Sequence, residues 1–156
     1  MPCEALRPPS SVLFPVIAIE VHNPTIDDID EVFNAIARVL EKRPGPYIAF
    51  ADLVGLTSMP DAKIRQRVAE RRAVHHQKYS PRILAVVNVV DSSLVRGTLT
   101  AINWLRPVTA THHYIATRKD GMRVCMQCIE ESGMSVPESV HSYMRALERD
   151  ARAPFP

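Results

Sequence analysis

Basic side chains are concentrated between residues 61 and 82 of this chain. The stretch contains only two carboxylates, Asp61 and Glu70, against seven cations: Lys63, Arg65, Arg67, Arg71, Arg72, Lys78 and Arg82. On a helix, Arg65, Arg72 and nearby His76 would share one stripe. Such a stripe is typical of a docking surface for an acidic partner or a phosphate-bearing ligand, and it is equally typical of a solvated basic face.

Histidines occur as two adjacent pairs, His75-His76 and His112-His113. Neighbours on a helix point about 100° apart, so neither pair chelates a metal by itself. A metal site shared by the two pairs, with His22 or Cys125, stays an alternative that the spacing does not require. We therefore predict no cofactor and no metal.

Cys125 and Cys128 have the Cys-x-x-Cys spacing. In redox proteins this motif begins a helix directly after a strand, where the helix dipole lowers the thiol pKa. Here the pair lies a turn or more inside a helix expected to begin at Asp120. Buried core thiols are the favoured interpretation, and a redox role is the alternative.

Recognisable catalytic signatures are absent from the sequence. It contains no Gly-x-Ser-x-Gly, no His-Glu-x-x-His and no phosphate-binding glycine loop. Asp52, Ser58 and a histidine could be combined into a catalytic set, but nothing in their spacing requires it. The sequence therefore favours binding over catalysis.

These residues are positioned by a central stretch, residues 46–74. Tyr47 to Ala51 form an apolar run that suits a strand buried on both faces, and Asp52 ends it. A loop follows, and Ser58-Met59-Pro60-Asp61 resembles a helix cap with proline in the first turn. A strand end, a loop and a helix start predict a site at the carboxyl edge of an α/β sheet.

Strands and helices alternate along the rest of the chain. Further strands are predicted at 12–21, 83–90 and 113–117, and further helices begin near Thr25, Asp91-Ser92-Ser93, Asp120 and Val136. Trp104 is predicted to lie in the core, and an exposed contact for a partner is the alternative. Arg96, near the start of its helix, is expected to pair with Asp91 or Asp52. Alternation of this kind predicts a mostly parallel sheet with right-handed crossovers.

Composition is that of an ordinary globular protein. The 156 residues are 46% hydrophobic and 23% charged, with a net charge of +2, too small to indicate nucleic-acid binding. We see no secretory signal and no apolar run of the length that a membrane helix needs. Three cysteines and no signal favour a reducing cytoplasm.

A resemblance to a known family is carried by several short segments. They are the helix after Thr25, the strand end Asp52-Leu53, the loop Leu56-Thr57-Ser58-Met59, and Val95-Arg96-Gly97 with Trp104-Leu105 on a later helix. In this order, residues 12–133 resemble the STAS domain of bacterial anti-sigma-factor antagonists and the STAS-like, Sec14-like single-domain proteins of bacteria. The resemblance implies a regulatory domain that binds a signalling or kinase-like protein.

One departure from the STAS pattern concerns phosphorylation. Switching antagonists carry Asp-Ser-Ser-Gly after Met, and the phosphorylated serine of that motif falls here on Ala62. The resemblance therefore implies that this phosphorylation is lost. Asp61 would supply a weaker fixed charge, and Ser58 stays a displaced acceptor. Ser92 superficially matches the motif but is more simply a helix cap.

The sequence as a whole predicts a STAS-like α/β domain with a four- to five-stranded, mixed, mostly parallel sheet flanked by helices. A flexible arm is expected at 1–11, the domain at 12–133 and a C-terminal helix and tail at 134–156, where the helix covers a sheet edge or makes a homodimer contact. We predict a non-enzymatic protein-binding module; its predicted partner surface is Ser58, Asp61, Arg65, Arg72, Ser92 and Arg96. The alternatives are a small-ligand or lipid carrier and a hydrolase or thiol enzyme.

Overall fold

One parallel sheet forms the centre of the molecule. The structure is a computed structural model that describes residues 9–105, 107 and 109–156. Within them, four strands lie in the order β1-β2-β3-β4; they are β1 (Val16–Glu20), β2 (Tyr47–Asp52), β3 (Ile83–Val89) and β4 (His112–Ile115). All three neighbouring pairs are parallel. The α/β class is confirmed, while the expected mixed sheet is wrong: the one antiparallel pairing in the described residues is an isolated bridge between Ser10 and Ala18.

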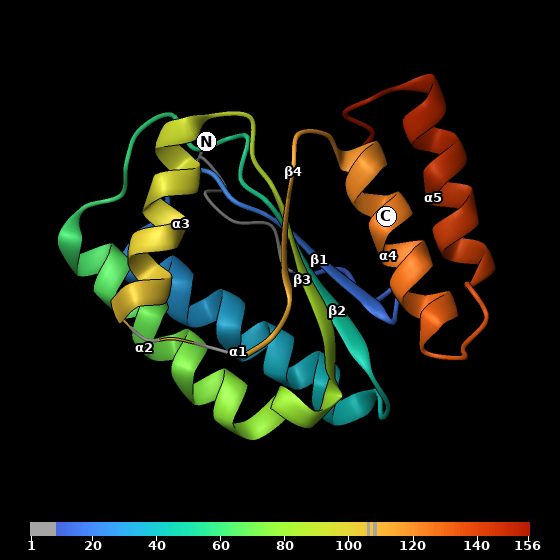
Figure 1. Cartoon of the computed structure of the whole chain (residues 1–156), viewed down its shortest axis with the longest axis horizontal. Helices are drawn as coiled ribbons and strands as arrows, with labels where there is room; N and C mark the ends of the chain where they lie inside the picture. Colours follow the sequence, from blue (N-terminus) through green and yellow to red (C-terminus); the bar gives the residue numbers. More distant parts are fainter. Residues whose placement is uncertain (1–8, 106, 108) are drawn as a thin grey trace.

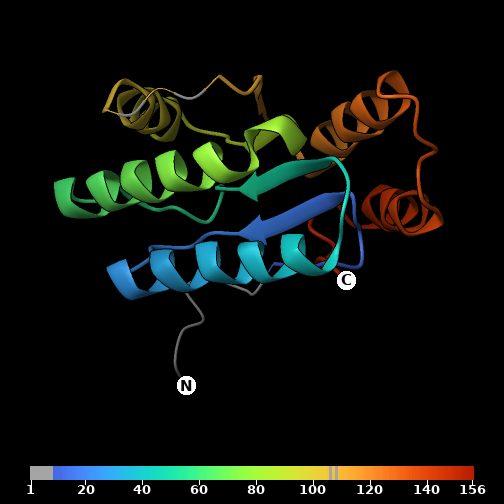
Figure 2. The same ribbon diagram turned by 90° about the horizontal axis from the view of Figure 1, so that it is seen from below.

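Two layers of helices cover the sheet. Helices α1 (Ile26–Lys42), α2 (Ala62–Tyr79) and α3 (Ser93–Leu105) lie on one face, and α4 (Arg118–Glu131) and α5 (Glu138–Arg149) lie on the other (Figure 1). A short 3-10 turn, η1 (Ser80–Arg82), joins α2 to β3. Right-handed crossovers between successive neighbouring parallel strands place every connecting helix on the same face. Figure 2 shows α1 and α2 running side by side over the strands.

Side chains alternate between the two faces of each strand. In β2, Ile48 and Phe50 join the core under α4 and α5, whereas Tyr47 faces α1 and α2. In β3, Ala85 and Val87 belong to the α4 side. The alternation of a strand therefore turns Asn88 toward the layer formed by α1, α2 and α3.

The α4 side of the sheet is tightly packed. Met122, Cys125 and Ile129 of α4 are fully buried against the strands. A Cβ atom at Gly121 would lie 2.9 Å from Cε2 of Phe50, so glycine lets α4 approach the sheet closely. Helix α5 adds Val140, Tyr143 and Leu147 to this core and therefore covers α4 and the sheet.

Helix starts follow local capping chemistry. Thr25 and Asp28 form the predicted capping box of α1, and the Ser92 hydroxyl accepts from the Val95 amide, 3.1 Å away. Helix α2 differs from expectation because Asp61, not Ser58, is its cap: Asp61 Oδ1 accepts from the Ile64 amide at 2.9 Å. A carboxylate directly before the helix is a strong cap, and it leaves Ser58 in the loop.

Several sequence-based expectations need correction. Trp104 is 81% exposed, so its placement in the core was wrong. The first strand is shorter than 12–21, since residues 12–15 form a turn before β1. Most of the predicted arm, residues 1–11, lies outside the described residues. No helix in the described ranges is long and apolar enough to cross a lipid bilayer.

Candidate ligand-binding cavity

A cavity of about 210 Å³ lies between the sheet and the layer formed by α1, α2 and α3. Most of its wall is aliphatic; the contributing side chains include Ile17, Ile19, Val32, Ile36, Val68 and Ile102. The wall therefore combines side chains from all four strands with side chains from the three helices above them. It is a largely apolar space of the kind in which proteins hold small molecules.

Small side chains at the centre of the sheet explain why this space exists. Ala49 and Ala51 are the residues through which the middle of β2 faces α1, α2 and α3, and both line the cavity. On the other face of the same strand, Ile48 and Phe50 fill the space under α4. Two alanines leave a hollow because the helices above rest on larger side chains around them.

An arginine without a carboxylate partner lines one end of the cavity. Arg72 Nη2 lies 3.4 Å from His112 Nε2. No carboxylate oxygen of the described residues lies within 4.0 Å of its guanidinium. Burial lowers the pKa of Arg72 from its ordinary value, yet a guanidinium keeps its proton at neutral pH. A positive charge therefore faces a largely apolar cavity.

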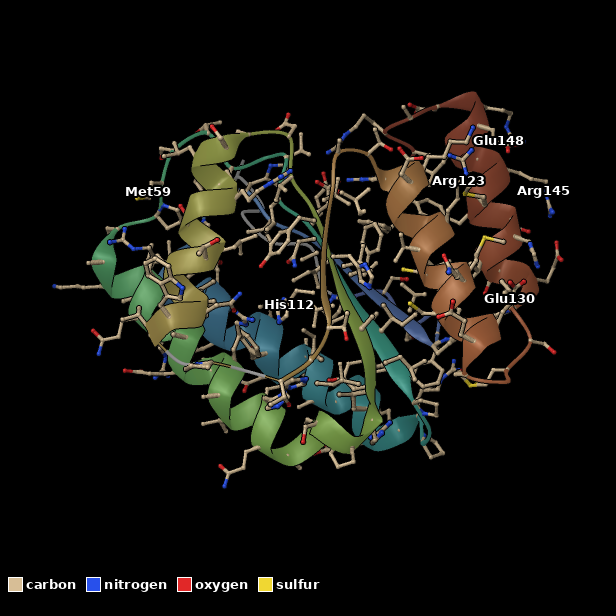
Figure 3. All side chains as sticks on the ribbon, in the orientation of Figure 1. Met59, His112, Arg123, Glu130, Arg145 and Glu148 are labelled. Atoms are coloured by element: carbon tan, nitrogen blue, oxygen red, sulfur yellow. The ribbon has the colours of Figure 1, made fainter. Side chains whose placement is uncertain are left out.

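His112 is held neutral beside this arginine. Burial, and then the charge of Arg72, lower the pKa of His112 from 6.5 to about 4. Figure 3 shows His112 between β4 and the helices of that layer. His76 of α2 closes the same end, with its Nε2 3.0 Å from the Thr109 hydroxyl oxygen. Near pH 7 Arg72 therefore supplies a positive charge at this end of the cavity, and His112 adds none.

Two asparagines lie in the same wall. Asn88 of β3 is 6% exposed and lines the cavity. Asn103 donates to the Tyr114 hydroxyl at 3.2 Å, but its own Oδ1 is buried without a partner. A buried carbonyl oxygen without a partner costs free energy, so Asn103 Oδ1 is available to a hydroxyl or amine donor of a ligand.

A neutral pair, His75 and Tyr47, closes the cavity between α1 and α2. The Tyr47 hydroxyl lies 2.7 Å from His75 Nε2, and Phe33 contacts the His75 ring edge-on. Burial lowers the pKa of His75 to about 4 and raises the pKa of Tyr47. Both groups are therefore neutral near pH 7.

The six predicted partner-binding residues have different places in the structure. Arg65 and Arg72 line the cavity, and Arg65 Nη1 donates to the Pro60 carbonyl at 2.6 Å. Asp61 and Ser92 are helix caps. Ser58 is exposed on the loop before α2, and Arg96 is exposed on α3.

Asp52 pairs with other arginines than the Arg96 that the sequence suggested. It is fully buried on the α4 side of the sheet, where it binds Arg118 Nε and lies 2.7 Å from Arg152 Nη1. The suggested pairing of Asp52 with Arg96 is therefore wrong. Glu20, its neighbour in β1, lies 3.0 Å from Arg118 Nη2.

The thiols belong to the core of the α4 side. Cys125 is fully buried, and burial raises its pKa well above the ordinary value. Cys128 is partly buried, and burial also raises its pKa. Both thiols are therefore protonated at neutral pH, as suits packing rather than nucleophilic chemistry.

Sequence reasoning missed most of the cavity wall. His112 was noted only as half of a histidine pair, and Tyr114 and Asn103 were not singled out. The sequence signal that could have indicated the cavity is Asn88, the one polar residue that interrupts the apolar run 83–90. A polar residue inside a doubly buried strand requires a partner or a cavity.

Compared with models of protein families, with curated proteins and with solved structures, this chain gives no significant match. The resemblance to STAS domains therefore stays a prediction.

Proposed function

We propose that this protein binds a small apolar molecule in the cavity between the sheet and helices α1, α2 and α3. The main support for this proposal is the size and the apolar lining of the cavity. Its volume is about 210 Å³, and an apolar protein cavity of about 150 Å³ is known to take up benzene. A ligand of about ten non-hydrogen atoms fits this scale.

The chemistry of the wall supports binding rather than catalysis. The described lining contains no carboxylate, thiol or serine hydroxyl. Nucleophilic catalysis uses such groups next to a base. What the wall offers is apolar contact area together with a few polar groups at one end, the usual composition of a binding pocket. The role that we propose is thus a carrier or a ligand-responsive sensor.

The test uses 4-fluorotoluene, a neutral probe of suitable size, observed by fluorine NMR. Wild-type protein should bind it, and Ala49→Leu should weaken binding about tenfold or more because three added carbons occupy the cavity. Ala62→Leu makes the same change at an exposed position at the start of α2 and should bind like wild type. Absence of binding by the wild type, or equal binding by Ala49→Leu, would contradict the proposal.

A second proposal keeps the regulatory, STAS-like role. It is supported by exposed apolar side chains at the two ends of α3, where Leu94 is 49%, Trp104 81% and Leu105 56% exposed. Exposed apolar side chains on one helix are typical of a protein contact. The expected partner is a signalling or kinase-like protein.

This second proposal is tested by affinity capture from the native host with wild type and with Trp104→Ser. A specific protein retained by wild type and lost from the variant would support it. Arg65→Glu and Arg72→Glu should also weaken capture if the basic side of α2 takes part. Identical retained proteins from all variants would count against it.

A further inference from the structure

We infer that the cavity selects an apolar monocarboxylate, whose carboxylate pairs with Arg72 while its hydrocarbon part fills the aliphatic remainder. This inference rests on the proposed binding function and adds the chemical class of the ligand. Its physical basis is the coincidence of an arginine without a carboxylate partner and an otherwise largely apolar wall.

The polar groups form one patch because of the strand register. Asn88 of β3 is directly paired with Tyr114 of β4, and both side chains line the cavity. Parallel neighbours lie about 4.8 Å apart. Tyr114 in turn contacts Asn103, and Arg72 contacts His112, two residues before Tyr114. Arg72 and these polar side chains therefore gather over the β3–β4 side of the cavity.

Charge balance identifies the head group as an anion. Removing a guanidinium from water without a counter-charge costs free energy. No described carboxylate offsets this cost for Arg72. Arg67, on the same helix, shows the contrast, because its Nε and Nη2 each lie 2.8 Å from an oxygen of Asp30. An anion brought by the ligand would supply to Arg72 what Asp30 supplies to Arg67.

The number of charges favours a carboxylate over a phosphate monoester. His112 stays neutral down to about pH 4, so it adds no second charge at pH 7. Arg65 also lines the cavity, but it lies seven residues before Arg72 on α2, about 10 Å along the helix axis, and its Nη1 donates to the Pro60 carbonyl. One guanidinium balances one negative charge and can bind a carboxylate with two parallel hydrogen bonds. A phosphate monoester carries nearly two charges.

The size of the cavity limits the hydrocarbon part. With about 210 Å³ available, octanoate, which has ten non-hydrogen atoms, is a suitable probe. 1-Octanol matches its chain and lacks the charge. Comparing the two at pH 7.5 isolates the contribution of the carboxylate.

The experiment measures dissociation constants for octanoate and 1-octanol with wild type, Arg72→Met and Arg71→Met. Wild type should prefer octanoate by about tenfold or more, the range expected for a charged hydrogen-bonded pair. Arg72→Met should lose this preference and still bind 1-octanol. Arg71→Met is the matched control, because Arg71 instead contacts Asn34 and Asp30 of α1, and it should retain the preference.

A wild-type measurement covers the case in which Arg72→Met fails to fold. The Nε–H resonance of the Arg72 side chain should shift on addition of octanoate and stay in place with 1-octanol. Equal affinity for the two probes, retention of the preference in Arg72→Met, or an unmoved Arg72 resonance would overturn the inference while leaving the cavity as a binding site. If octanoate, 1-octanol and 4-fluorotoluene all fail to bind, the proposed function itself fails.

Discussion

Arg118 is the largest fully buried side chain among the described residues. It binds Asp52 and Glu20 through its guanidinium, donates to the Ala153 carbonyl at 2.8 Å and lies 4.4 Å from the centre of the Phe155 ring. Burial by itself would lower the pKa of Arg118, but the hydrogen bond and charge of Asp52 raise it above its ordinary value. This one residue thus joins two strand ends to the C-terminal segment.

Removing Arg118 should destabilise the protein strongly. Arg118→Met leaves the buried carboxylate of Asp52 with Arg152 alone, and breaking a buried ion pair costs about 3–5 kcal/mol. Arg123→Met on the same helix is the control, because the Arg123–Asp120 pair is more than half exposed and exposed pairs contribute up to about 1 kcal/mol. Urea unfolding followed by circular dichroism measures both. Equal effects of the two substitutions would show that the buried cluster does not stabilise the fold.

His75 and His112 should make stability depend on pH. Burial is the main reason that the pKa of each falls from 6.5 to about 4 in the folded protein. Between these values the unfolded chain binds protons that the folded chain does not. The free energy of unfolding should therefore be fully present above pH 6.5 and fall as the pH drops toward 4.

The pH dependence is tested with a double variant, His75→Gln and His112→Gln. Its free energy of unfolding should change less between pH 7 and pH 5 than that of wild type. His141→Gln, a histidine on α5 far from the cavity wall, should follow wild type. A wild-type stability that is flat across this range would contradict the burial of the two neutral histidines.

At the scale of elements, α2 divides its cations between two environments. Arg65 and Arg72 line the cavity, whereas Arg67 and Arg71 contact carboxylates and amides of α1. The basic stretch noted in the sequence is therefore neither one uniform docking surface nor one solvated face. Periodicity predicted the helix, but which cations face inward depends on how α1 and α3 pack beside it.

Helix α3 shows the limit of reading a helix face from apolar spacing. Val95 and Ile102 are buried, but Trp104 and Leu105 extend beyond the stripe that the sheet covers. A helix with apolar residues on more than one side leaves some of them in solvent unless another element covers them. The sequence alone does not reveal which side of α3 stays in solvent.

The exposure of Trp104 on α3 can be tested directly by tryptophan fluorescence. It is the single tryptophan of the chain and is 81% exposed. The emission of the folded protein should therefore resemble that of a solvated indole and be readily quenched by iodide. Urea unfolding should change the emission maximum little. A blue-shifted, poorly quenched emission in a monomeric sample would place Trp104 in a contact instead.

At the scale of the whole molecule, the order of strands and helices was predictable because hydrophobic periods and caps are local properties. The sheet was expected to be mostly parallel for the same reason. The cavity was not predictable, since it depends on the distance between two layers and on residues as far apart as Ile17 and Tyr114. Arg118 was missed because a single arginine near a helix start carries no signal of burial.

The two layers differ in how firmly they hold the sheet, and this difference bears on how a ligand would enter. On one side, close contact at Gly121 and the ion cluster of Arg118 fix α4 and the strand ends together. On the other, α1, α2 and α3 enclose a hollow. Opening of that layer would expose the cavity while the strands stay paired, so amide exchange should be fastest in α1, α2 and α3 and slow down there when the cavity is filled.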